Sequence, residues 1–110
     1  MARTKYINRK ATVDGIVFDS IKEARRYNEL KLLQKAGQIE ELELQQEFEL
    51  IPSQRVGGRV VERAVKYRAD FTYKQDGKLV VEDTKGVKTK DYIIKRKLML
   101  FVHGIQIKEI

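Results

Sequence analysis

Two aspartates and a lysine share one face of an expected β-hairpin. The hairpin turns at Asp76-Gly77, a dipeptide typical of two-residue type I′ turns, and this register places Asp70 opposite Asp83. Lys85 lies two residues beyond Asp83, so its side chain points to the same face. Carboxylates that face each other about 5 Å apart repel, and Mg²⁺ or Mn²⁺ bound between them would remove that repulsion. With an amine beside the metal, these groups indicate metal-assisted hydrolysis of a phosphodiester.

A purely electrostatic explanation of the same residues stays open. Lys85 and Arg68, which face each other in this register, would also balance the charges of Asp70 and Asp83 on a solvated sheet face. An Asp-x-Lys tripeptide is common and is weak evidence by itself. Glu82 adjoins Asp83, but in a regular strand its side chain points to the opposite face, so Asp83 is selected as the second acid.

The composition excludes several other chemistries. The chain of 110 residues has no cysteine, which excludes disulfides and thiolate catalysis. With a single histidine, His103, and no cysteine, a zinc site is not expected, and a histidine-based hydrolase would depend on that one residue, which is assigned to a helix C-terminus. Lysine and arginine outnumber aspartate and glutamate by 23 to 16, and the resulting net charge of +7 favours a polyanionic partner such as nucleic acid.

Turn and cap signals predict the elements that position these groups. A capping box, Ser20 with Glu23, begins a helix over 20–36, and Thr89 caps a second helix over 89–102. Alternating apolar residues and Asp-Gly turns predict extended segments over 11–18 (a short hairpin), 39–51, 64–74, 79–85 and 105–110. The last strand follows a helix, so it should run parallel to the strand before that helix.

The remaining segments complete an α/β fold with one mixed sheet. Residues 1–10 are expected to form a basic, mobile arm, and residues 11–110 a single domain. The stretch 52–59, with its Gly57-Gly58 pair, is interpreted as a flexible loop. The aromatic residues assigned to the core are Tyr67, Phe71, Tyr73 and Phe101.

The sequence also resembles a known family. The run Tyr67-Arg68-Ala69-Asp70-Phe71, a hairpin, and then Val81-Glu82-Asp83-Thr84-Lys85-Gly86 resemble the catalytic core of the PD-(D/E)XK nuclease superfamily. The segment from Val13-Asp14-Gly15 to Glu29-Leu30 is similar to a small phage and prophage family assigned to that superfamily, and the likeness continues to Ile110. It implies a restriction-endonuclease-like fold with the core order helix-strand-strand-strand-helix-strand, here preceded by the N-terminal hairpin.

The resemblance implies a role for each residue of the site. Asp70 and Asp83 would bind the metal, and Lys85 would be the catalytic lysine. Glu23 matches an additional acid that members supply from the first helix, as a catalytic metal ligand, as a helix cap or as both. Gln45 matches a glutamine that some members bring to the catalytic site; the alternative is a surface strand residue.

Positive side chains of the arm and of both helices are expected to contact DNA. Tyr92 and Lys95 match a recurring pair near the phosphate path of the superfamily, or else are a core-edge residue and a solvated cation. The residues expected to bind nucleic acid are Arg25, Arg26, Lys88, Lys90, Tyr92, Lys95 and Arg96, with Arg3, Lys5 and Arg9 of the arm.

The expected function is that of an endonuclease, dependent on Mg²⁺ or Mn²⁺, that hydrolyses DNA phosphodiester bonds. A phage or prophage origin, the cytoplasm of a bacterial host, and a role in the recombination, repair or processing of DNA, branched DNA included, are expected with it. The alternative is a non-catalytic nucleic-acid-binding accessory module that retains the fold. No membrane-spanning segment is expected, and a homodimer is one arrangement that would place two sites on two strands.

Overall fold

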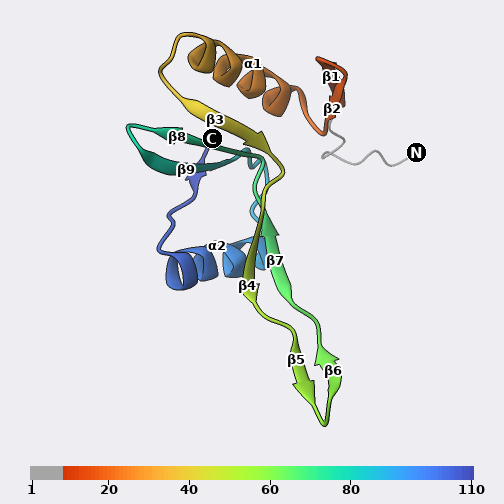
Figure 1. Cartoon of the computed structure of the whole chain (residues 1–110). Helices are drawn as coiled ribbons and strands as arrows, with labels where there is room; N and C mark the ends of the chain where they lie inside the picture. The colour runs from red at the N-terminus through yellow and green to blue at the C-terminus, as the bar shows by residue number, and fades with distance from the viewer. Residues whose placement is uncertain (1–8) are drawn as a thin grey trace, which may run out of the picture.

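The computed structural model describes residues 9–110, a mixed α/β structure with two helices and several small sheets (Figure 1). Most of the expected basic arm, including Arg3 and Lys5, lies outside the described residues. The elements, in chain order, are β1 (Ala11–Val13), β2 (Ile16–Phe18), α1 (Ile21–Lys35), β3 (Glu40–Leu44), β4 (Glu47–Ile51), β5 (Gln54–Val56), β6 (Arg59–Glu62), β7 (Val65–Arg68), β8 (Phe71–Gln75), β9 (Lys78–Asp83), α2 (Lys90–His103) and β10 (Lys108–Glu109).

The local signals located both helices and two hairpins correctly. The Ser20 side chain accepts a hydrogen bond from the Glu23 backbone N–H at 3.1 Å, and Thr89 caps α2 in the same way through Tyr92. β1 pairs antiparallel with β2 across the Asp14-Gly15 turn, as expected. β8 pairs with β9 in the register that the second Asp-Gly turn predicts, from Gln75 opposite Lys78 onward.

One four-stranded sheet, in the order β10-β9-β8-β3, separates two apolar cores. Figure 1 shows α1 on one side of this sheet and α2 on the other. The core under α1 includes Leu30 and Phe71, and the core at α2 includes Tyr67 and Met99. β10 runs parallel to β9, as the strand-helix-strand order predicts, although it is shorter than the expected segment 105–110.

A double bend divides two of the expected strands. The segment 39–51 breaks between β3 and β4, where Gln45 adopts a left-handed backbone conformation (φ 57°), and the segment 64–74 breaks at Ala69 and Asp70. Two backbone hydrogen bonds join the breaks, from Ala69 N–H to the Gln46 carbonyl (2.9 Å) and from Gln45 N–H to the Asp70 carbonyl (3.3 Å). β3 therefore pairs with β8, while β4 and β7 form a separate two-stranded ribbon.

Two expectations were wrong. Of the stretch expected to be a flexible loop over 52–59, residues 54–59 belong to the β5–β6 hairpin, because Gly57 and Gly58 both adopt positive φ angles and form a tight turn. Phe101 is 87% exposed and does not belong to the core. Since α2 buries Tyr92 and Met99, which are seven residues apart, Phe101 points away from that buried face at about 200° from Met99.

No helix within residues 9–110 is long and apolar enough to cross a membrane.

Glu82 is a buried acid that joins α1 to the sheet. Its side chain has no exposed surface, and it accepts hydrogen bonds from the Arg26 guanidinium at 2.8 and 2.7 Å and from the Tyr73 hydroxyl. Burial alone would raise the pKa of Glu82, but the bonds from Arg26 and Tyr73 outweigh it and hold that pKa below its ordinary value. Glu82 is therefore a buried anion whose charge depends on Arg26.

Removing this guanidinium should destabilise the fold. We expect Arg26→Met to lower the free energy of unfolding by about 3 kcal/mol, because the buried Glu82 carboxylate loses its main partner. Arg25→Met is the matched control, since the neighbouring Arg25 is exposed. Urea denaturation of both variants at pH 7 tests this, and equal midpoints would contradict it.

Candidate active site

Asp70 lies in the bend between β7 and β8, directly beyond the last paired residues of the β8–β9 ladder. Its Oδ2 accepts hydrogen bonds from the backbone N–H and the hydroxyl of Thr84, both at 2.8 Å. Burial opposes the charge on Asp70, but hydrogen bonds from Asp83 and Thr84 outweigh it and hold the pKa of Asp70 below its ordinary value. Asp70 is thus a fixed carboxylate at neutral pH.

Asp83 ends β9 and is 1% exposed. Its Oδ2 accepts a hydrogen bond of 2.6 Å from the Tyr67 hydroxyl and lies 3.3 Å from the Lys85 amine. Burial, and next the hydrogen bond that its protonated form donates to Asp70, raise the pKa of Asp83 to about 7. The two acids therefore share a proton near neutral pH and titrate as a pair.

Once Asp83 is ionised, its second oxygen, Oδ1, is buried and receives no hydrogen bond from residues 9–110. Buried polar atoms of native proteins are nearly always satisfied, so an orphaned carboxylate oxygen points to a missing partner. A cation is a chemically suitable one, because a carboxylate oxygen can only accept hydrogen bonds or bind positive charge. Asp83 with the adjacent Asp70 therefore fits a site for a divalent metal ion.

Lys85 is held next to this pair by two contacts. Its amine forms the ion pair with Asp83 and lies 4.5 Å from the centroid of the Tyr92 ring, a cation–π contact. The Tyr92 hydroxyl in turn donates to Glu109 at 2.7 Å, which fixes the ring. The Lys85 side chain is 28% exposed, so its amine is both oriented by protein and accessible from solvent.

Glu23 brings a third carboxyl group to the site from the first turn of α1. Its side chain is only 6% exposed. Burial, and next the negative charges of Asp70 and Asp19, raise the pKa of Glu23 to about 7. Because the capping contact uses the Glu23 backbone N–H, its carboxyl group remains available to face Asp70.

Other expected site residues lie elsewhere or interact differently. The Gln45 side chain is exposed, and only its backbone N–H contacts Asp70. Arg68 does not balance the acid pair: it is exposed and forms an ion pair with Glu47 at 3.6 Å. Its position follows from the bend, because β7 pairs with β4 and not with β9. Of the two expected counter-charges, the structure places only Lys85 at the acids.

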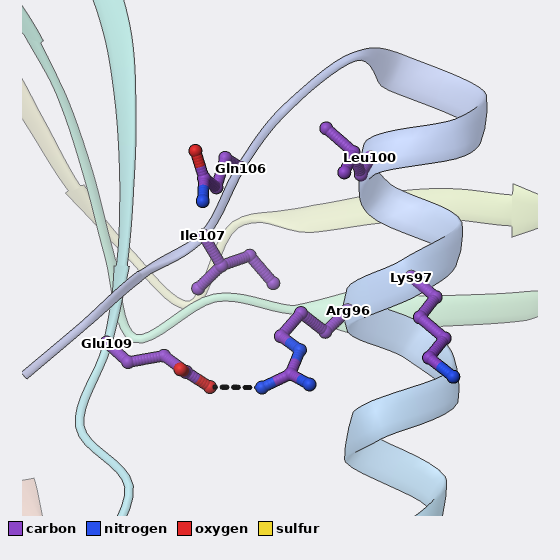
Figure 2. A pocket seen from close by; sticks show the side chains of 6 residues that line it. All are labelled: Arg96, Lys97, Leu100, Gln106, Ile107 and Glu109. Carbon is purple, nitrogen blue, oxygen red and sulfur yellow. Dashed lines mark hydrogen bonds and ion pairs between the residues drawn. The ribbon is translucent and has the colours of Figure 1, made fainter.

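Several residues expected to bind nucleic acid interact with acids of the protein itself. Arg26 is bound to Glu82, as described above. Lys88 and Arg96 each form an ion pair of 3.2 Å with Glu109. Figure 2 shows Arg96 reaching from α2 to Glu109 across a pocket of about 210 Å³. Among the other expected contacts, Arg25 and Lys90 are exposed, and Lys95 is half-buried.

Sequence reasoning missed Tyr67, Thr84 and Glu109 as parts of this site. Tyr67 donates to Asp83 and Thr84 donates to Asp70. Both residues lie near the aspartates in the sequence, but these hydrogen bonds form only because of the bend before β8. Glu109 pairs with Asp83 across the parallel β10–β9 ladder. The sequence could have indicated Glu109, because the expected last strand, parallel to the strand before it, brings an acid next to the end of β9.

Residues 9–110 contain no group of three or more His, Cys, Asp and Glu side chains arranged to hold a metal ion. Mg²⁺ needs fewer protein ligands than this, because it is usually bound through one or two carboxylates and completes its shell with waters and substrate phosphate. The fit to a metal therefore rests on the Asp70–Asp83 pair and its unsatisfied oxygen.

The chain was compared with known proteins. The family described as Protein of unknown function (DUF1064) matches residues 3–108. No curated protein and no solved structure matches the chain.

The raised pKa values of Asp83 and Glu23 make the metal-free protein less stable at high pH. The folded state keeps protons that the unfolded chain releases above about pH 4, so the free energy of unfolding falls as the pH rises through about 7. We expect Asp83→Asn to raise this free energy by about 2 kcal/mol at pH 8 and to change it little at pH 4, because asparagine cannot ionise. Urea denaturation in EDTA at both pH values measures the difference.

The control for this variant is Asp76→Asn, at an exposed turn whose left-handed backbone (φ 53°) suits asparagine. It should behave alike at both pH values. An equal effect of Asp83→Asn at pH 4 and pH 8 would contradict the assignment.

Proposed function

We propose a nuclease activity for this chain, which belongs to the DUF1064 family of proteins of unknown function. The protein is a Mg²⁺-dependent endonuclease that hydrolyses DNA phosphodiester bonds, encoded by a phage or prophage and acting in DNA recombination, repair or processing. It is a member of the PD-(D/E)XK superfamily with a restriction-endonuclease-like core. The order α1, β3, β8, β9, α2, β10, with β10 parallel to β9, supports this core.

One observation carries the proposal. Asp70 and Asp83 share a proton near neutral pH, the Lys85 amine lies 3.3 Å from Asp83, and once that proton is lost the buried Oδ1 of Asp83 has no hydrogen-bond donor within residues 9–110. A solvated charge network would not require an unsatisfied carboxylate oxygen, whereas a metal site does. This difference favours catalysis over the electrostatic explanation of the same residues.

Asp70 and Asp83 would hold the Mg²⁺ ion, and Glu23, which faces Asp70, would become a third ligand only if its side chain moved closer, because residues 9–110 contain no three-acid group arranged for a metal. When bound, the ion supplies Lewis-acid polarisation of a phosphate oxygen and acidification of a water molecule. Three carboxyl groups close together are compatible with this role: burial is the main cause of the raised pKa values of Glu23 and Asp83, and the neighbouring Asp70 raises both further.

The other residues orient these groups. Tyr67 and Thr84 each donate to one aspartate and fix its carboxylate. Lys85, held against the Tyr92 ring, positions the attacking water or stabilises the negative charge that develops on the phosphate. Each is held by neighbouring side chains before substrate binds, which lowers the reorganisation that catalysis requires.

DNA is expected to bind over the site through cations whose charge remains accessible. Arg25 and Lys90 are exposed, and Lys95 is half-buried. Lys88 and Arg96 are both ion-paired with Glu109, so any phosphate that they contact would be bound by this three-residue cluster and not by a free cation. These contacts are to phosphates and give salt-sensitive affinity with little dependence on sequence. A homodimer that acts on a branched DNA substrate remains part of the proposal.

The catalytic assignment predicts loss of cleavage without loss of binding. We expect the wild-type protein to nick supercoiled DNA with Mg²⁺ or Mn²⁺ and not with EDTA. Asp70→Asn, Asp83→Asn and Lys85→Met should each reduce the rate by about 1,000-fold or more, because each removes a metal ligand or the oriented amine. Agarose-gel nicking assays measure the rate, and fluorescence anisotropy with labelled duplex measures binding.

Asp76→Asn and Lys78→Met, at the exposed β8–β9 turn, are the matched controls and should cleave at the wild-type rate. DNA binding without cleavage in the presence of any of the metals tested would favour the non-catalytic accessory module and refute the proposed nuclease activity. Cleavage that survives in the Asp83→Asn variant would remove the proposed metal site.

A metal bound to Asp83 should also stabilise the fold. We expect Mg²⁺ at ten times its Kd to raise the free energy of unfolding by about 1.4 kcal/mol, and the effect should grow from pH 6 to pH 8 as the acid pair loses its proton. Thermal unfolding with and without Mg²⁺ measures it. Asp83→Asn should abolish the response, and a response of equal size in that variant would place the ion elsewhere.

A further inference from the structure

The β5–β6 hairpin is an arm with no protein around it. Every residue of both strands is exposed. Figure 1 shows the hairpin extending from the end of the β4–β7 ribbon, away from both helices and from the four-stranded sheet. A two-stranded hairpin is at best marginally stable in water by itself. An exposed arm of this kind therefore calls for a binding partner that would order it.

Both faces of the arm present an arginine beside a valine. Arg55 is opposite Val60 on one face, and Val56 is opposite Arg59 on the other. The exposed fractions of Val56 and Val60 are 69% and 48%, so neither face is covered. A flat protein partner would cover a single face, whereas a groove surrounds a ribbon on both. This arrangement fits a groove better than a flat surface.

The charge of the arm matches a polyanion. Arg55, Arg59 and Arg63 are opposed by one acid, Glu62. Among the salt bridges within residues 9–110, none involves these three arginines. Arg55 donates a hydrogen bond to the Gly58 carbonyl at 3.1 Å, which braces the turn and leaves its charge without an acidic partner.

We propose that the β5–β6 hairpin inserts into the major groove of duplex DNA about one helical turn from the cleavage site. The inference rests on the proposed nuclease function and adds to it a second contact, remote from the acid pair. The major groove of B-DNA, about 12 Å wide, admits a two-stranded β-ribbon. Arg55 and Arg59, on opposite faces, would each contact phosphates of one groove wall, and the valines would lie against the bases.

The length of the β4–β7 ribbon also determines the distance between the hairpin's contact with DNA and the cleaved bond. Gly58, at the turn, lies twelve positions before Asp70, and β7 leads directly into the bend that holds Asp70. At about 3.3 Å per residue the arm reaches up to about 40 Å from the site, close to the helical repeat of about 34–36 Å. The hairpin would therefore contact the duplex about one turn to one side of the cleaved bond.

The test compares a variant of the arm with a variant of equal charge change elsewhere. The arm variant is the double substitution Arg55→Gln/Arg59→Gln, and the control is Lys35→Gln/Lys78→Gln, at the end of α1 and at the β8–β9 turn, where both lysines are exposed. Binding to a duplex of about 40 base pairs, which is longer than the reach of the arm, is measured in EDTA by fluorescence anisotropy over a series of salt concentrations. Circular dichroism and thermal unfolding confirm that both variants fold.

We expect the arm variant to bind at least about 10-fold more weakly than the wild type and to show a salt dependence shallower by about two in log–log slope, since two phosphate contacts are lost. The control should bind within about twofold of the wild type. Hydroxyl-radical footprints should show protection about one turn from the site with the wild type and none there with the arm variant.

Different results overturn different claims. If the wild type binds DNA and the arm variant matches it in affinity, salt slope and footprint, the inference about the arm is wrong and the nuclease proposal stands. If the wild type binds no DNA, both fail. Sedimentation is measured in parallel, and an arm variant that turns a dimer into a monomer with DNA affinity unchanged would show that the hairpin binds a second copy of the chain instead.

Discussion

The close approach of two carboxyl groups, on Asp70 and Asp83, is the constraint around which the site is arranged. Left to themselves, the two groups would drive the ends of β8 and β9 apart. The protein opposes this with donors on each side: Thr84 binds Asp70, while Tyr67 and Lys85 bind Asp83. The remaining repulsion shows as a proton shared near neutral pH and, once that proton is lost, as an unsatisfied buried oxygen that a divalent cation would satisfy.

The adjacent acids of β9, Glu82 and Asp83, have different roles because successive side chains of a strand point to opposite faces of the sheet. Glu82 is enclosed by Arg26 and Tyr73 on the α1 side and holds the helix to the sheet. Asp83 lies toward α2 with a single oxygen satisfied. α1 contributes to both, since its first turns supply Glu23 to the acid pair and Arg26 to the buried ion pair.

The parts of this structure that follow from local chemistry were predictable from the sequence. The Asp76-Gly77 turn fixed the β8–β9 register, and cap residues located both helices. The bend was not predictable, because Gln45 has no preference for the left-handed backbone that it adopts, and two long-range hydrogen bonds hold it there. Arg68 was consequently misplaced, and the ties of Tyr67 to Asp83 and of Thr84 to Asp70 were missed.

The two-residue turn between β8 and β9 determines which side chains of β9 lie on each face of the sheet. One inserted residue there would shift the register by one and turn every side chain of β9 to the opposite face of the sheet. Glu82 would then lie on the face of Asp70, and Asp83 would turn with Lys85 to the face of Arg26, where its shorter side chain could not reach the guanidinium in the same way. The length of this loop therefore determines which carboxylate of β9 lies beside Asp70, although the loop contacts neither acid.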